Sequence, residues 1–194
     1  MRQGLRHFFG LTVLAFLTII AKAQEFGGNP SSIKWQQINT DTARVIFPAG
    51  LESAGERVAT IIHDLQKNHT STIGNQLRKI NIVLQNQTTI SNAYVSLGPY
   101  RSEFYLFAPQ NSFALGALNW VDNLSLHEYR HAEQYNNFNV GLSKVARVLF
   151  GQQGQALANA AAVPNWFFEG DAVFYETSLS RQGRGRLPNF FNGL

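Results

Sequence analysis

The chain has 194 residues, of which 44% are hydrophobic and 14% charged, and its formal net charge is +4. Its length and composition suit one folded domain with a hydrophobic core. The absence of cysteine excludes a disulfide framework and a thiolate metal site. No cluster of Lys and Arg interleaves with aromatic residues, so we expect no nucleic-acid partner.

The first 23 residues have the three parts of a secretory signal peptide. Two arginines come first, residues 8–21 are mostly apolar, and a small-x-small triplet at residues 21–23 suits a signal peptidase. The apolar run is short for a membrane span, so we expect cleavage before Gln24; an uncleaved N-terminal anchor is the alternative. The sequence therefore predicts a bacterial protein that is exported, periplasmic or secreted, without stable membrane insertion after cleavage. Its single domain would occupy residues 24–194, where 13 basic and 12 acidic residues remain.

Hydrophobic periodicity predicts strands in the first half of the chain and helices in the second. The predicted strands are residues 33–40, 43–48, 80–84, 93–97 and 103–108. The predicted helices are residues 51–68, 119–136, 143–150, 156–162 and 166–180, the last with Asn165 as its N-cap. Because strands and one helix precede the other helices, the order favours an α+β domain with a mixed sheet over alternating βαβ units.

Two histidines on the helix predicted over residues 119–136 have the spacing of a metal site. In the motif HEYRH, at residues 127–131, they are four positions apart, which brings both imidazoles to one face of a helix. Glu128 points about a quarter-turn away, where it can reach a metal-bound water. This HExxH arrangement is typical of zinc hydrolases. As alternatives, Glu128 fits a helix capping box with Ser125, and both histidines fit hydrogen-bonded core positions.

A catalytic zinc needs a third protein ligand and an open position. The segment WFFEGDA, at residues 166–172, places Glu169 at the start of the last predicted helix. Antiparallel packing on the motif helix would aim this carboxylate at both imidazoles, and Gly170 would let the two backbones approach closely. Glu169 also suits the helix dipole without any metal.

Other residues of the last predicted helix have weaker assignments. Glu176 shares the face of Glu169, and both Glu176 and Asp171 are candidates to orient an imidazole, with an exposed salt bridge as the alternative. The position of Tyr175 favours packing over stabilisation of an oxyanion. The aromatic residues expected in the core are Trp166, Phe167 and Phe168. The tail arginines at 181, 184 and 186 are expected to be solvated or to contact a missing segment, with contact to a substrate carboxylate as the alternative.

The HEYRH motif followed by WFFEGDA resembles the gluzincin branch of zinc metallopeptidases, with a peptidase MA-like domain. There, the third ligand is a glutamate on a second helix. The continuation AVFYET and the later GRGR resemble exported bacterial proteins in which such a domain precedes a TolB-like β-propeller. The resemblance covers about residues 119–188 and implies a zincin-like mixed sheet. Glu169 follows His131 by 38 positions, more than in related aminopeptidases, so residues 137–163 should form a helical excursion.

The resemblance implies a zinc metallopeptidase that hydrolyses a peptide or protein substrate. His127, His131 and Glu169 would hold Zn²⁺, and Glu128 would act as the general base on an activated water. The strand at 103–108 is the expected edge for an extended substrate. The alternatives are a non-catalytic zincin-like scaffold or interaction module of the bacterial envelope and a zinc hydrolase acting on a non-peptide bond.

The end of the chain suggests an incomplete domain. Gluzincins usually take a residue that stabilises the transition state from beyond the third ligand, and only 25 residues follow Glu169. We therefore expect a C-terminal part to be missing.

Overall fold

The computed structural model describes residues 28–69, 72–110, 118–188 and 190. Its chain divides into two compact units, Met1–Ile33 and Lys34–Leu194. The predicted signal peptide lies outside the described residues, and in the first unit a turn is described in which Ile33 N–H donates to Pro30 O. Among the described residues, none of the helices is both long and apolar enough to cross a membrane.

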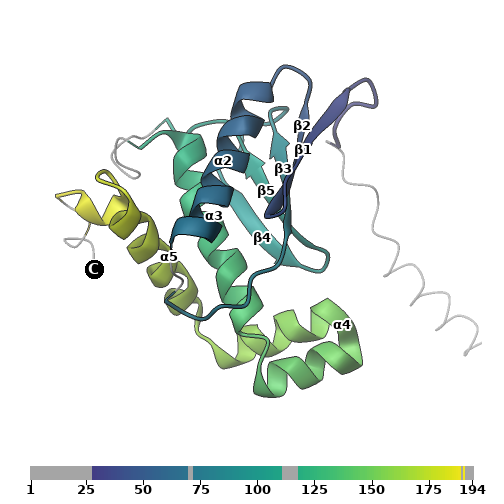
Figure 1. Ribbon diagram of the computed structural model, residues 1–194, viewed down its shortest axis with the longest axis vertical. Coiled ribbons are helices and arrows are strands. Elements are labelled where there is room, and N and C mark those ends of the chain that lie inside the picture. Colours follow the sequence, from purple (N-terminus) through teal and green to yellow (C-terminus); the bar gives the residue numbers. More distant parts are fainter. Residues whose placement is uncertain (1–27, 70–71, 111–117, 189, 191–194) are drawn as a thin grey trace, which may run out of the picture. The chain divides into compact units, whose positions relative to one another are not determined.

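The second unit contains a mixed five-stranded sheet, as predicted (Figure 1). The strands are β1 Trp35–Asn39, β2 Ala43–Pro48, β3 Ile80–Gln85, β4 Ala93–Leu97 and β5 Tyr100–Tyr105. Their order is β1-β2-β3-β5-β4; the three inner strands are parallel, and both edge strands are antiparallel to their neighbours. Alternate residues of β3 are buried, namely Ile80, Ile82 and Leu84, as the period of two predicts.

The expected substrate edge at residues 103–108 is wrong. The strand β5 that contains residue 103 ends at Tyr105 and lies between β3 and β4, so its hydrogen-bonding groups face neighbours on both sides. The edges of the sheet are β1 and β4, and β4 is the edge strand that packs against the motif helix. Sequence order alone suggested that β5, the last strand before the motif helix, is an edge strand. The strand pairing instead places the preceding strand, β4, at the edge.

Four α-helices and one short 3₁₀ helix complete the described part of the second unit. They are α2 Glu52–Asn68, α3 Trp120–Asn137, α4 Gly141–Ala162, α5 Asn165–Leu179 and η2 Arg184–Arg186. Helix α2 packs against β1, β2 and α3, while α3 also packs against β4 and α5 (Figure 1). The main core lies between the sheet and these helices, and includes Val45, Phe47, Val58, Ile62, Ile82, Leu84, Phe104 and Leu124.

The start of α3 decides between two explanations of Glu128. The Asn119 side chain accepts a hydrogen bond from the backbone N–H of Val121 at 3.0 Å, so Asn119 is the N-cap. The hydroxyl of Ser125 donates to Val121 O at 2.8 Å inside the helix. A capping box formed by Ser125 and Glu128 is therefore excluded, and Glu128 lies in the third turn of α3.

Helix α4 is the helical excursion expected between the second histidine and Glu169. Gly151 has φ 67° and ψ −156°, which breaks the helix into two halves that fold back on each other (Figure 1). Gly154, by contrast, does not break the helix. A Cβ there would lie 2.7 Å from Phe150 Cβ, so this glycine permits the close approach of the two halves.

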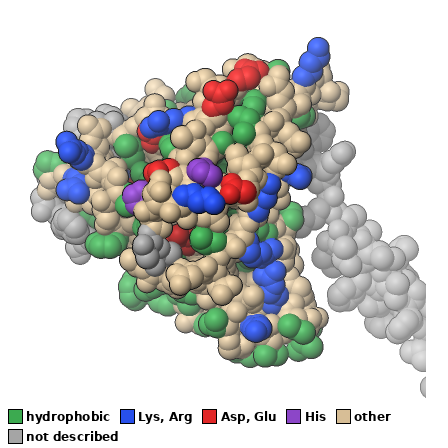
Figure 2. Space-filling model, viewed as in Figure 1, with side chains coloured by type: hydrophobic (Ala, Val, Ile, Leu, Met, Phe, Trp, Pro, Cys, Tyr) green, Lys and Arg blue, Asp and Glu red, His purple; other side chains and the backbone are tan. Residues whose placement is uncertain are grey.

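Three glutamines hold α4 to the rest of the second unit. The side chains of Gln152 and Gln153 bond to the backbone of Tyr100 and Gly98, and Gln155 Nε2 donates to Tyr135 O at 2.7 Å. The outer side of the helix carries large exposed hydrophobic residues, namely Leu142, Val145, Val148, Leu149, Phe150 and Leu157. Figure 2 shows hydrophobic and basic side chains at the bottom of the view, where Figure 1 places α4. Only the inner side of α4 therefore belongs to the folded core.

The N-terminal part of α5 corrects three predictions. Pro164 is the N-cap, with ψ 146°, and Asn165 is already helical, because proline cannot continue a helix from the preceding segment. Trp166 is 74% exposed, whereas Phe168 is buried against the rings of Tyr135 and Phe138. Gly170 is exposed, and a Cβ there would meet nothing within 4 Å, so it does not enable a close helix approach.

Candidate metal centre

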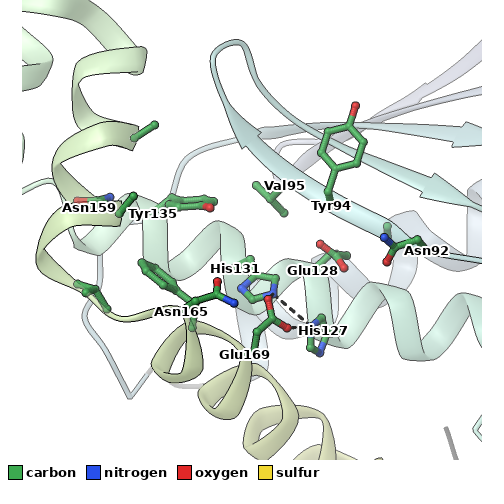
Figure 3. A pocket seen from close by; sticks show the side chains of 15 residues that line it. Asn92, Tyr94, Val95, His127, Glu128, His131, Tyr135, Asn159, Asn165 and Glu169 are labelled. Carbon is green, nitrogen blue, oxygen red and sulfur yellow. Dashed lines mark hydrogen bonds and ion pairs between the residues drawn. The ribbon is translucent and has the colours of Figure 1, made fainter. Parts of the chain in front are cut away.

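Two helices bring together the three residues proposed as metal ligands. His127 and His131 come from successive turns of α3 and Glu169 from the second turn of α5, with one ligand atom of each within 4.8 Å of the others (Figure 3). The two Nε2 atoms are 3.2 Å apart. Glu169 places Oε2 3.4 Å from His127 Nε2 and Oε1 3.6 Å from His131 Nε2. The cluster could therefore hold a metal ion.

The ligand set of this cluster is compatible with zinc. A tetrahedral ion with ligand bonds of about 2.0–2.1 Å separates any two ligand atoms by about 3.3–3.4 Å. The two imidazole nitrogens, 3.2 Å apart, lie close to this value, and each faces a different oxygen of Glu169, at 3.4 and 3.6 Å. A set of two imidazoles and one carboxylate is typical of catalytic zinc sites.

Glu176 orients the first histidine. Its Oε2 lies 3.1 Å from His127 Nδ1, so the carboxylate can accept the Nδ1 hydrogen and leave Nε2 facing Glu169. Both side chains are buried, Glu176 completely. Glu176, one of the two candidates to orient an imidazole, therefore contacts the ring of His127.

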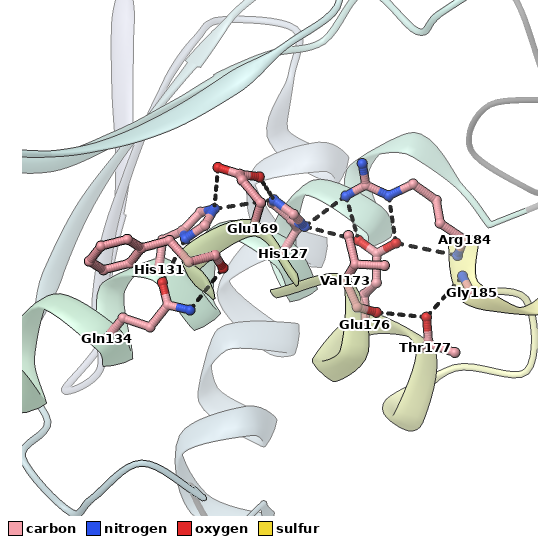
Figure 4. A network of polar contacts seen from close by, with 10 residues as sticks. His127, His131, Gln134, Glu169, Val173, Glu176, Thr177, Arg184 and Gly185 are labelled. Atoms are coloured by element: carbon pink, nitrogen blue, oxygen red, sulfur yellow. Dashed lines mark hydrogen bonds and ion pairs between the residues drawn. The ribbon is translucent and has the colours of Figure 1, made fainter. Parts of the chain in front are cut away.

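Arg184, expected to be solvated, balances the buried charge of Glu176. Its guanidinium donates to Oε1 at 2.7 Å and to Oε2 at 2.9 Å, and also lies beside His127 Nδ1 (Figure 4). Burial alone would raise the pKa of Glu176, but the hydrogen bonds from Arg184 and His127 lower it to about 2. The short helix η2 places Arg184 here, and no local pattern in the tail indicates this contact.

Asp171 contacts a different set of residues from those that the sequence suggested. Its carboxylate accepts two hydrogen bonds from Arg130, at 2.7 and 3.0 Å, and one from Gln134 at 2.7 Å. Gln134 in turn lies 2.8 Å from Nδ1 of His131. Asp171 thus reaches an imidazole through a glutamine, and the sequence interpretation missed both Arg130 and Gln134.

The two histidines differ in basicity. Burial opposes protonation of His127, but hydrogen bonds to Glu169 and Glu176 raise its pKa to about 9. Burial and the neighbouring charge of His127 lower the pKa of His131. The cluster without metal therefore holds a proton that a bound cation would displace.

Glu128 has the environment of a general base. It is 5% exposed and lines the cavity beside the histidines. Burial, reinforced by the charge of Glu169 and opposed by that of His127, raises its pKa to about 7. A carboxyl group with a pKa near neutrality suits proton transfer at physiological pH.

A cavity of about 400 Å³ opens beside the cluster, a volume that suits a small ligand or a peptide side chain. The edge strand β4 forms one wall through Ala93, Tyr94 and Val95 (Figure 3). The second half of α4 forms another wall, through Ala156, Asn159 and Ala160. Glu128, the three candidate ligands and a free strand edge therefore border one space.

Tyr175 and two further histidines lie outside this space. Tyr175 is 6% exposed and packs under the Arg130 guanidinium, 4.7 Å from its ring centre, in agreement with the predicted packing role. His63 and His69, on or just after α2, pair with Asp41 and Asp64. Neither histidine belongs to the metal cluster.

No protein-family model, no curated protein and no solved structure matches the chain significantly. The functional argument therefore depends on the fold and on the geometry of the cluster.

Proposed function

We propose that the chain is a zinc-dependent metallopeptidase of the gluzincin type. The observation that carries the proposal is the cluster itself. The two imidazole nitrogens lie 3.2 Å apart, each faces an oxygen of Glu169 at 3.4 or 3.6 Å, and Glu128 lines the same cavity. Zn²⁺ bound there would activate a water molecule and polarise a carbonyl group. Glu128 would take the proton of this water and pass it to the leaving amine.

The free edge of β4 supports a peptide as substrate. Tyr105 N–H donates to Asn92 O at 3.1 Å, so Asn92 faces β5. Because antiparallel strands alternate, the N–H and C=O groups of Ala93 and Val95 point away from β5, toward the free edge. An extended peptide can pair there by strand addition and bring a backbone carbonyl close to Glu128.

The buried state of Glu128 favours catalysis over a scaffold role. Its Oε2 is fully buried and has no hydrogen-bond partner among the described residues. A buried carboxylate oxygen without a hydrogen bond lowers the stability of the fold. An interaction module has no reason to retain such a group. Export to the periplasm or to the medium remains a prediction from the first 23 residues, and the proposed partner is a peptide or protein substrate.

Metal content and hydrolysis together test the function. The purified protein should contain about one zinc ion per chain, as catalytic sites of this type do. His131→Ala should lose the zinc, whereas His63→Ala, which changes a histidine outside the cluster, should keep it. Glu128→Gln should keep zinc and lose peptide hydrolysis. A folded protein that binds no zinc, or hydrolysis that survives Glu128→Gln, would contradict the proposal.

A further inference from the structure

Gln134 occupies a position between two of the candidate metal ligands. It lies one turn after His131 on α3, and its side chain is completely buried. Its Oε1 is 2.8 Å from His131 Nδ1 (Figure 4). Its Nε2 donates to Phe168 O at 3.0 Å and to Asp171 Oδ2 at 2.7 Å. One amide group therefore links the ring of His131 to the first turn of α5.

The orientation of this amide is fixed by its neighbours. Phe168 O is a carbonyl oxygen, and an ionised Asp171 can only accept hydrogen bonds. Both therefore require the NH₂ group of Gln134, which leaves Oε1 facing His131. If the amide were flipped, an oxygen would face two acceptors and the hydrogen bonds to them would be lost.

Asp171 is itself held in place by a buried arginine. Arg130 donates two hydrogen bonds to the Asp171 carboxylate, in the bidentate geometry that is strongest for this pair. The Arg130 side chain is 1% exposed, and Glu133 and Thr72 accept its remaining hydrogen bonds at 2.9 and 2.6 Å. Arg130, Asp171 and Gln134 thus form a connected series that ends at His131.

The series determines which nitrogen of His131 carries hydrogen. Because Oε1 of Gln134 only accepts, Nδ1 of His131 must donate. A neutral His131 then presents the lone pair of Nε2 to the site, toward Glu169 and His127. In addition, Phe168 O is the carbonyl immediately before Glu169, so the same amide holds the turn that carries the third ligand.

We propose that Gln134 is a positioning residue that fixes the tautomer of His131 and the place of Glu169 together. This role rests on the metal site of the proposed function. His127 is oriented by the charged pair of Glu176 and Arg184, whereas His131 is oriented by a neutral amide that adds no negative charge beside the metal. The fourth residue of the motif, Arg130, supports the amide from within the same helix.

Zinc affinity of matched variants tests the proposal. Gln134→Leu removes all three hydrogen bonds with little change in volume, and its zinc affinity should fall about 10- to 100-fold, the range for residues that orient a ligand. Gln155→Leu is the matched control: Gln155 is also completely buried and bonds Tyr135 O and Arg147, but no candidate ligand. Both variants should lower the melting temperature without metal, and only Gln134→Leu should lower the zinc affinity.

The tautomer of His131 gives a second readout that needs neither a variant nor a metal. Above the pKa of His131, ¹⁵N NMR of the metal-free wild-type ring should show hydrogen on Nδ1. Hydrogen on Nε2 would overturn the proposal, as would a folded Gln134→Leu with unchanged zinc affinity, or an equal loss in Gln155→Leu. If Gln134→Leu does not fold, the NMR result decides. A wild-type protein without zinc binding would instead refute the proposed function, and the tautomer would still test Gln134.

Discussion

Glu176 Oε2 lies 3.1 Å from Nδ1 of His127, although 49 positions separate the two residues in the chain. The contact joins α5 to the motif helix and directs Nε2 of His127 toward Glu169. Since Glu176 is fully buried, its charge must be balanced within the protein, and Arg184 supplies the balancing charge. The orientation of the first ligand therefore depends on a residue near the end of the described chain.

Loss of Arg184 should destabilise the fold. Arg184→Met leaves Glu176 buried without its cation, and we expect the free energy of unfolding to fall by about 3 kcal/mol. Arg186→Met is the control, because Arg186 is exposed and, among the described residues, bonds only the backbone carbonyls of Thr177 and Ser180. Urea unfolding of the three proteins measures the difference. Equal losses in both variants would show that Arg184 has no special role.

The stability contributed by Glu176 should depend on pH. Its folded-state pKa is lowered from 4.5 to about 2, against the effect of burial, by hydrogen bonds from Arg184 and His127. A depressed pKa stabilises the fold above the unfolded-state value, and this stability is lost as pH falls from about 4.5 toward 2. Wild type should therefore exceed Glu176→Gln in unfolding free energy at neutral pH, and the gap should shrink through this window. A gap that does not change with pH would contradict the ion pair.

Glu169 should be required for tight metal binding. Glu169→Gln removes the charged ligand while keeping the shape, and its zinc affinity should fall by more than about 100-fold, beyond the effect of residues that only orient a ligand. Glu56→Gln changes another exposed glutamate, on α2, and serves as the control. The increase in melting temperature on adding zinc reports binding, because a ligand that binds only the folded state stabilises it. An unchanged increase in Glu169→Gln would exclude Glu169 as a ligand.

The free edge of β4 should take part in substrate binding. Val95→Pro removes an N–H that points away from β5, so the sheet should persist while KM for peptides rises and zinc content stays unchanged. Gln37→Pro is the matched control. Ala49 N–H donates to Lys34 O, so Lys34 faces β2. Because successive residues of a strand alternate, the N–H of Gln37 points away from β2, toward the free edge of β1. This variant should not change KM. Equal kinetics of wild type and Val95→Pro would exclude β4 as the peptide-binding edge.

Patterns within one segment predicted most of the secondary structure. The expected bounds at 43–48 and 93–97 are those of β2 and β4, and the motif helix α3 differs by one residue at each end. These segments repeat apolar residues with a clear period and end at Asn, Gly or Pro, which are local signals. At the start of α5 the local signal was misleading. Pro164, and not Asn165, is the N-cap, and the exposure of Trp166 and Gly170 depends on how the neighbouring helices pack.

The sequence by itself determined the α+β class and placed both imidazoles on one helix face, because the helical repeat fixes side chains four residues apart. It also pointed to Glu169 through the composition of one short segment. Only the tertiary structure decided that β4, and not β5, is the edge strand beside the site and that Arg184, Gln134 and Arg130 support the site. These contacts join residues that are distant in the chain, such as Arg130 and Asp171, 41 positions apart. Their proximity follows from how the helices pack, and no periodicity within one segment encodes that packing.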